Sequence, residues 1–145
     1  MMIIRGDLIK LAAAGRFDVI VHGCNCMCTM GAGVALAVRR AFPAAYRADQ
    51  ATVRGDWSKL GTFSCAKIGA LVVVNAYTQF AFGRDRRYVD YDAVRSVFRA
   101  IRSRFSGRRI AYPAIGCNLA GGDWSIVAPI IDAELAGEQH WLVRL

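Results

Sequence analysis

The stretch that decides the fold of this chain is Val21-His22-Gly23-Cys24-Asn25-Cys26-Met27-Cys28-Thr29-Met30-Gly31-Ala32-Gly33-Val34. An apolar strand (19–21) runs into a polar loop, then into Gly-Ala-Gly, then into a helix (33–42) that ends before a proline. Glycine lets the backbone approach a ligand closely, and the free N–H groups of a helix start bind anions. The stretch predicts a strand–loop–helix unit with a phosphate site. A tight strand-to-helix turn without a ligand would explain the same glycines.

A second stretch repeats this order of features: Ala111-Tyr112-Pro113-Ala114-Ile115-Gly116-Cys117-Asn118-Leu119-Ala120-Gly121-Gly122-Asp123-Trp124. Again a strand leads through small residues to a helix. In α/β sheets, ligands bind outside the carboxyl ends of the strands. Two such loops in one domain can hold the two phosphates of a diphosphate from opposite sides.

The rest of the chain alternates apolar, β-rich segments with helical patterns. Helices are expected at 91–105, where Val94, Phe98, Ile101 and Phe105 form one stripe, and at 124–135. Short strands are expected at residues 3–4, 62–68, 71–74, 110–112 and 141–143. This alternation predicts an α/β fold in which a mostly parallel mixed sheet lies between helices, as one domain over residues 1–145.

Composition narrows the class of protein. No apolar run approaches the ~20 residues that cross a bilayer. The first residues, Met1 to Arg5, show no secretion signal. The five cysteines are odd in number, and three of them crowd residues 24–28, which favours reduced thiols and a cytoplasmic location over a secreted disulfide scaffold.

The positive charge is local. Residues 84–109 hold nine of the nineteen basic residues, all arginine, against three aspartates, and the whole chain carries a net charge of +8. Such a segment is typical of a nucleic-acid surface or attracts an anionic ligand, and it equally fits a solvated helix face. The segment lacks the interleaved aromatic residues of single-strand platforms.

Together these motifs resemble the macro domain family. The resemblance rests on Gly6-Asp7-Leu8, His22 to Asn25, Gly31 to Val34 and Ile115 to Trp124, and it covers essentially the whole chain. It is strongest to the small, phage-like branch grouped with the ADP-ribose 1″-phosphate phosphatases and single-domain ADP-ribosyl hydrolases. The resemblance implies a three-layer α/β/α macro domain that binds ADP-ribose and hydrolyses a derivative at the distal ribose.

The resemblance also implies roles for particular residues. Asp7, with the Leu8 backbone nearby, would bind adenine N6, and Asn25 would sit at the distal ribose. The diphosphate and distal ribose would be wrapped by Gly31, Ala32, Gly33 and Val34 and faced by Gly116, Cys117, Asn118, Leu119, Ala120 and Gly121. Independently of the resemblance, the stretch Asn75 to Phe80 follows the strand at 71–74 and puts polar and aromatic groups, Tyr77 and Thr78 among them, on the same rim. Ordinary loop chemistry, with Phe80 in the core, would explain the same stretch.

Two departures from the family bear on the chemistry. Many members carry an aromatic residue against the distal ribose where this chain has Ala120. One branch uses a lysine and an aspartate where this chain has Gln79 and Ala120. A covalent lysine mechanism is therefore not expected, and a non-catalytic ADP-ribose reader remains the alternative function.

The catalytic candidates are Asn25, Asp123 and His22, in that order. Asp123 could activate water, or could cap the helix that follows it. His22 could position water near neutral pH, or could be a buried histidine bonded to backbone. No cofactor is expected, and no metal either, because no Cys-x-x-Cys pair or histidine cluster completes a zinc site around Cys24, Cys26 and Cys28. The expected partners are ADP-ribose or an ADP-ribosylated substrate and, through residues 84–109, nucleic acid, with no membrane.

Overall fold

A single six-stranded sheet organises the molecule in a computed structural model that describes residues 1–145. The strands stand in the order β1-β6-β5-β2-β4-β3, and only β3 runs antiparallel to its neighbour. Their bounds are β1 Met2–Arg5, β2 Val19–Cys24, β3 Phe63–Ile68, β4 Leu71–Tyr77, β5 Ile110–Tyr112 and β6 His140–Arg144. The first and last strands of the chain pair with each other at one edge of this sheet.

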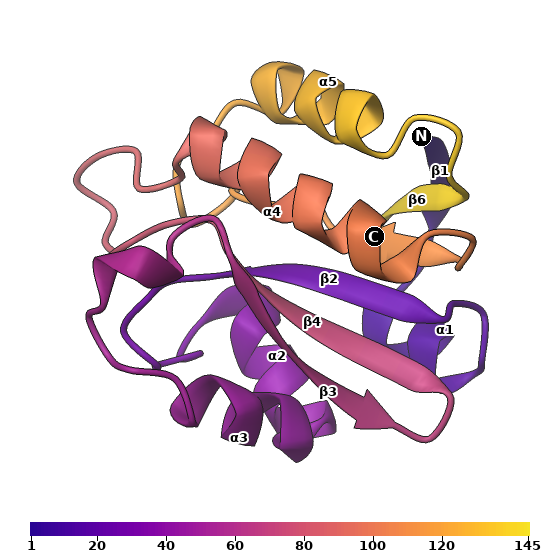
Figure 1. Cartoon of the computed structure of the whole chain (residues 1–145), viewed down its shortest axis with the longest axis horizontal. Coiled ribbons are helices and arrows are strands. Elements are labelled where there is room, and N and C mark those ends of the chain that lie inside the picture. The colour runs from indigo at the N-terminus through magenta and orange to yellow at the C-terminus, as the bar shows by residue number, and fades with distance from the viewer.

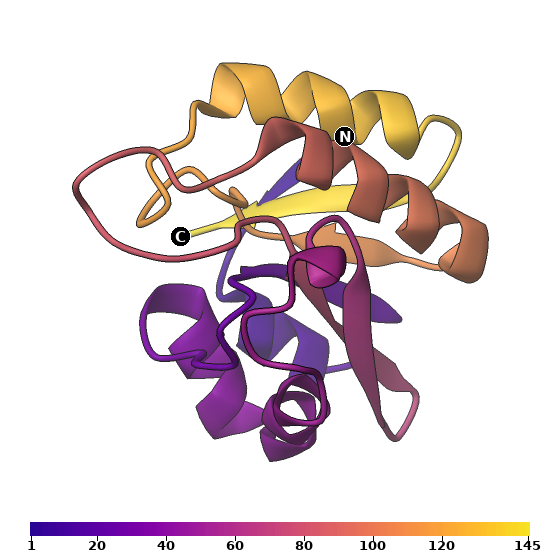
Figure 2. The ribbon, with the colours of Figure 1, turned by 60° about the vertical axis from the view of Figure 1, so that its left-hand side comes forward.

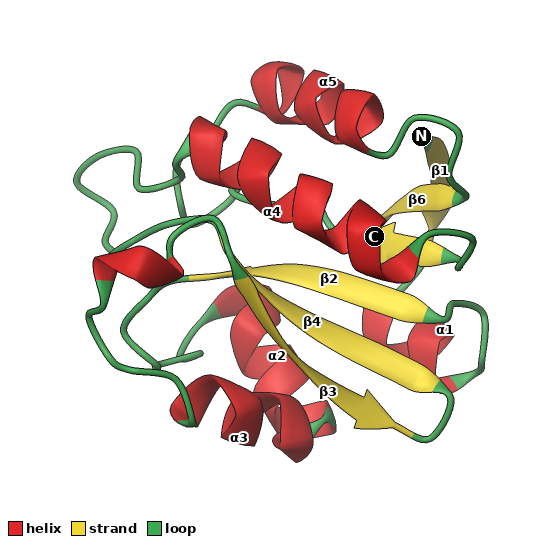
Figure 3. Cartoon of the chain, in the orientation of Figure 1, coloured by secondary structure: helices red, strands yellow, loops and turns green.

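Helices cover both faces of the sheet, which makes three layers (Figure 1, Figure 3). Helices α4 and α5 lie on one face, and α1, α2 and α3 lie on the other. The bounds of the helices are α1 Leu8–Ala13, α2 Gly33–Ala41, α3 Pro43–Gln50, α4 Tyr91–Phe105 and α5 Trp124–Glu134, with a short 3₁₀ turn η1 at Trp57–Lys59. None of these helices is both long and apolar enough to cross a membrane.

Two apolar cores, one on each side of the sheet, explain the sequence patterns. Strand β4 is buried along its whole length, because alternate residues face opposite cores. The apolar stripe of α4 lies in the core between the sheet and helices α4 and α5, and consists of Val94, Phe98, Ile101 and Phe105. Arg95, Arg99 and Arg102 are exposed on the solvent-facing side of the helix. The amphipathic spacing therefore decided which face of α4 packs.

The expected fold class is confirmed, and the structure adds elements that the sequence patterns did not reveal. Helix α1 has only six residues, which is too short to show a helical period. Helix α3 begins at Pro43, the residue expected to end α2. Proline does end α2 there, but it also fits the first turn of a new helix, where no backbone donor is lost. All five cysteines are free thiols.

Candidate functional site

A cavity of about 400 Å³ opens at the carboxyl ends of the central strands. Three loops surround it: the β2–α2 loop (25–32), the β4–α4 loop (78–90) and the β5–α5 loop (113–123). Figure 2 shows these loops gathered at one end of the sheet. The wall is lined by Gly23, Cys24, Asn25, Thr29 to Ala35, Gln79, Phe82, Pro113 to Gly116 and Asn118 to Ala120.

The β2–α2 loop presents open backbone to this cavity. A Cβ built on Gly31 would meet only the Thr29 carbonyl oxygen, 4.0 Å away. Cys28 and Met30 have φ of 57° and 43°, and they are the only non-glycine residues of the chain with positive φ. Such conformations cost about 1 kcal/mol or more and persist where surrounding contacts impose them. The loop is therefore held in one strained shape, with Gly31 and Ala32 exposed at its end.

The loop ends at the N-terminus of α2. No side chain caps this helix, because its N-cap residue is Ala32. The first backbone N–H groups of a helix have no intrahelical partner and carry the positive end of the helix dipole. Gly33, at φ 57°, begins the helix beside the cavity. This end of α2 is thus free to bind an anion.

The β5–α5 loop faces it across the cavity and is closely packed on its outer side. The Gly122 N–H donates to the Gly116 carbonyl at 2.7 Å. A Cβ on Gly116 would come within 2.5 Å of Val89, and one on Gly122 within 2.4 Å of the Gly116 oxygen. Leu119, on the inner side, reaches to 3.0 Å from a Cβ built on Gly33, so the two loops nearly meet there.

The β4–α4 loop adds two side chains to the cavity wall. Gln79 donates from its amide to the Ala81 carbonyl at 2.8 Å, which fixes its orientation. Phe82 lines the cavity and stays 57% exposed. Cys26 N–H donates to the Phe80 carbonyl at 2.9 Å, so this loop is tied to the β2–α2 loop.

The cavity wall carries no Asp, Glu, His, Lys or Arg side chain. Its one titratable group is the Cys24 thiol, whose pKa is raised by burial, so it stays protonated near neutral pH. An anion in this cavity must therefore be held by backbone N–H groups and amide or hydroxyl side chains. The wall offers no group that is charged near neutral pH to act as an acid or a base.

Asn25 is the predicted catalytic residue that the structure places in the cavity wall. Its Oδ1 accepts from the Met27 N–H at 2.8 Å, and its Nδ2 donates to the Thr29 hydroxyl at 2.9 Å. These bonds fix the amide in one orientation and leave one Nδ2 hydrogen for a ligand. Its catalytic role stays a prediction.

His22 lies behind the cavity rather than in its wall. Its Nε2 is 2.7 Å from Asn75 Oδ1. The Asn75 amide nitrogen donates to Ala45 and Ser64, so its oxygen must accept and His22 carries hydrogen on Nε2. Burial lowers the pKa of His22 to about 4, which keeps the ring neutral near pH 7. Its partner is a side-chain amide, and the alternative of a backbone partner was wrong.

Asp123 caps α5 and lies outside the cavity wall. Its Oδ1 accepts from the Ser125 N–H at 2.9 Å and the Ser125 hydroxyl at 2.7 Å. These hydrogen bonds hold the pKa of the exposed carboxyl below its usual range. The cap is confirmed, while a role for Asp123 as a general base stays a prediction.

Several predicted binding residues lie behind or beside the cavity rather than in its wall. Asp7 caps α1 by accepting from the Lys10 N–H at 3.0 Å. Tyr77 is buried in the core between the sheet and helices α1 to α3, and its hydroxyl donates to the Asp49 carboxylate at 2.8 Å. The buried Thr78 hydroxyl has no partner and faces Gly23. Outside the wall lie Asp7, Leu8, Tyr77, Thr78, Cys117 and Gly121, and their binding roles stay predictions.

Sequence reasoning missed Phe82 altogether, and it named Gln79 only within the stretch 75–80 and as a departure from the family, not as a binding residue. Both follow β4, so the rule that ligands gather at strand carboxyl ends was the signal that could have found them. That rule singled out residues 75–80 and stopped two residues short of Phe82.

The comparisons with known proteins agree with this geometry. A family model for the macro domain matches residues 21–131. An uncharacterized 17.5 kDa protein of Enterobacteria phage T4, from the tk-vs intergenic region, is 34% identical over 138 residues, which cover 89% of this chain and 86% of that protein.

Two solved structures extend the comparison. A protein of unknown function from Bacteroides thetaiotaomicron is 27% identical, with a TM-score of 0.82 over 99% of this chain and 97% of that one. DarTG of Thermosipho africanus, solved in complex with ADP-ribose, has a TM-score of 0.76 at 19% identity over 100% of this chain and 42% of that one. At that identity the likeness is one of fold.

Proposed function

Since the chain belongs to the macro domain family, we propose that it binds ADP-ribose in the cavity between the β2–α2 and β5–α5 loops. The observation that carries this proposal is the pair of glycine loops that face each other across about 400 Å³, beside the uncapped start of α2. A diphosphate fits such a site because backbone N–H groups and a helix N-terminus bind anions without a charged side chain. The T. africanus protein, which has the same fold, was solved with ADP-ribose.

The distal ribose would lie near Asn25 and Phe82. Family members often hold this ribose against an aromatic residue at the position of Ala120, and Ala120 is buried here. Phe82 comes from a different loop, yet it lines the same cavity with an exposed ring. We propose that Phe82 supplies the apolar surface that Ala120 lacks. The adenine would extend toward Asp7 and Leu8 at the start of α1.

Hydrolysis at the distal ribose is the second proposed function. It would act on ADP-ribose 1″-phosphate or on an ADP-ribosyl ester. The observation that favours it is the fixed amide of Asn25, whose free Nδ2 hydrogen can orient a water molecule in the cavity. With no charged group in the wall, the protein would act by positioning that water. Binding without turnover, as in an ADP-ribose reader, agrees equally well with this wall.

Calorimetric titration with ADP-ribose tests the binding proposal. We expect one saturable site, competition by ADP, and much weaker binding of adenosine, because the loops would hold the diphosphate. The absence of heat and of thermal stabilisation at millimolar ADP-ribose would overturn the proposal.

Incubation with ADP-ribose 1″-phosphate, with ADP-ribosylated protein and with ADP-ribosylated DNA tests hydrolysis. If turnover is found, Asn25→Ala should slow it while ADP-ribose still binds. Asp123→Asn should leave the rate unchanged if Asp123 only caps α5, and should abolish it if Asp123 is the base. No turnover of any substrate, with tight ADP-ribose binding, makes the protein a reader.

A further inference from the structure

A second, open cavity of about 550 Å³ lies outside the ADP-ribose site, between η1, the β4–α4 loop and the start of α4. Its wall holds four aromatic residues: Trp57, Phe80, Tyr88 and Tyr91. We call it the aromatic groove. Only part of this set was visible along the chain, because Trp57 is far in sequence from the other three. The fold thus places Trp57 and Phe80, which lie outside residues 84–109, beside the arginine-rich segment.

Trp57 is the most accessible ring of the aromatic groove. It stacks on Phe80 with ring centroids 3.3 Å apart and planes within 2°, and it stays 66% exposed. Phe80 holds one face of the indole, so the other face is open. A flat, exposed indole fixed from behind is a platform on which another planar group can stack.

Arginine side chains frame the same groove. The Arg86 guanidinium lies 5.0 Å from the centre of the Tyr88 ring, and that of Arg87 lies 4.4 Å from the centre of the Tyr91 ring. Both arginines line the groove and are exposed. Cation–π contacts of this kind keep a guanidinium over the ring while its outer N–H groups can meet a phosphate.

Acidic residues balance these two charges within the groove itself. Asp90 and Asp92 line it. Asp90 caps α4 by accepting from the Ala93 N–H at 3.0 Å, and Asp92 is exposed in the first turn. The wall is therefore neutral, and any attraction for a polyanion must come from beyond it.

That attraction comes from the exposed face of α4. Arg95, Arg99 and Arg102 follow Tyr91 by four, eight and eleven residues, so they continue the same helix face away from the groove. Arg99 pairs with Glu134 at 2.9 Å, whereas Arg95 and Arg102 have no carboxylate partner. Between residues 95 and 108 every exposed residue is Arg, Ser or Gly. We call this surface the arginine face.

We propose that single-stranded nucleic acid binds along the aromatic groove and the arginine face, with a base stacked on Trp57 and phosphates beside the α4 arginines. Single-strand sites combine an aromatic platform with a basic track. Here the aromatic groove supplies the platform, and the arginine face continues from it along α4. A duplex keeps its bases stacked inside and offers none to Trp57. The surface would bind unmodified strands, so the proposal goes beyond ADP-ribose binding and does not depend on it.

Fluorescence anisotropy with an unmodified, labelled DNA or RNA strand of about 12 nucleotides tests the proposal. We expect binding at low salt and quenching of Trp57 emission. Trp57→Ala should weaken affinity about tenfold, in line with the contribution of one stacked base, whereas Trp57→Phe should keep most of it. Because Trp57 is mostly exposed, Trp57→Ala should melt at nearly the wild-type temperature.

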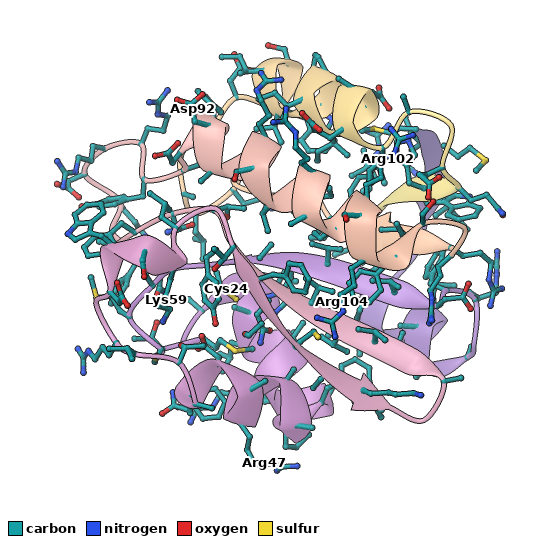
Figure 4. The ribbon with its side chains drawn as sticks, in the orientation of Figure 1. Cys24, Arg47, Lys59, Asp92, Arg102 and Arg104 are labelled. Atoms are coloured by element: carbon teal, nitrogen blue, oxygen red, sulfur yellow. The ribbon has the colours of Figure 1, made fainter.

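Charge variants test the arginine face separately. Arg95→Ala with Arg102→Ala should reduce the slope of log affinity against log salt by about 1.4, as for two counterions released from a single strand. The matched control is Arg40→Ala with Arg47→Ala, which removes the same charge from α2 and α3 and should leave the slope unchanged. Figure 4 shows Arg47 on α3, across the sheet from Arg102 on α4. Asp92→Asn should strengthen binding a few-fold.

The proposal would be overturned if the wild-type protein did not bind the strand at low salt, or if Trp57→Ala bound it as tightly as wild type. It would also be overturned if a duplex, or polyglutamate as a polyanion without bases, bound as tightly as the single strand. Gly31→Val separates this surface from the ADP-ribose site. This variant should bind ADP-ribose much more weakly and should bind the single-stranded nucleic acid as tightly as wild type.

Discussion

The two glycine loops of the cavity differ in what their glycines do. In the β2–α2 loop, a Cβ on Gly31 would point into nearly open space. In the β5–α5 loop, a Cβ on Gly116 or Gly122 would strike Val89 or the loop's own backbone. Glycine leaves open space in the first loop, where we propose that the diphosphate lies, whereas the second loop needs glycine to fold. Glycines in the two loops thus have different structural roles.

Gly122→Ala should have the largest effect and act on the fold. The added Cβ would lie 2.4 Å from the Gly116 carbonyl oxygen, so the loop must move and break its 2.7 Å hydrogen bond. We expect a loss of about 3 kcal/mol in the free energy of unfolding, measured by urea denaturation. A variant as stable as wild type would show that this loop is as open as the β2–α2 loop.

Acidification should lower the stability of the fold through His22, which is buried on β2 just before the β2–α2 loop. The pKa of His22 is about 4 in the folded protein and 6.5 when exposed, so between these values the unfolded chain binds more protons. His22 should therefore lower the free energy of unfolding by about 2 kcal/mol from pH 7 to pH 5.

Urea denaturation at the two pH values checks this, with His22→Gln as the variant that should lose its share of the pH dependence. The same dependence in His22→Gln as in wild type would remove His22 as its source.

Gly31→Val should act on the ligand and spare the fold. The valine side chain would occupy open space in the cavity. We expect ADP-ribose affinity to fall at least about tenfold, or ~1.4 kcal/mol, with the free energy of unfolding within about 0.5 kcal/mol of wild type. Calorimetry and urea denaturation measure the two quantities, and unchanged affinity would contradict the placement of the diphosphate.

Gly33→Val should reduce both ligand affinity and stability, unlike Gly31→Val. Gly33 has φ 57°, where a β-branched residue is strained, and its Cβ would lie 3.0 Å from Leu119. We expect it to lose ADP-ribose binding as well, with about 1–2 kcal/mol of added instability.

Phe82→Ala should have the smallest effect. The ring is mostly exposed, so the fold should not change, and ADP-ribose affinity should fall about two- to tenfold through loss of one aromatic surface. Phe82→Tyr is the matched control that keeps the ring. Equal affinities for all three proteins would mean that the distal ribose does not lie against Phe82.

Sequence reasoning reached the sheet, α2, α4 and α5 because their apolar spacing is regular and long. It missed α1 and α3, which are too short or too small-residue-rich to show a period. For the site, glycine-rich strand ends located both loops, including Asn25 and Gly31 to Val34. The sequence could not show that His22 and Tyr77 point behind the cavity, because the two faces of a fully buried strand look alike.

The structure of the complex with ADP-ribose tests the central claim most directly. The account predicts the diphosphate within hydrogen-bonding distance of backbone N–H groups from both glycine loops, at the start of α2, with no charged side chain in contact. A diphosphate bound elsewhere, for example beside Arg86 and Arg87 in the aromatic groove, would contradict it.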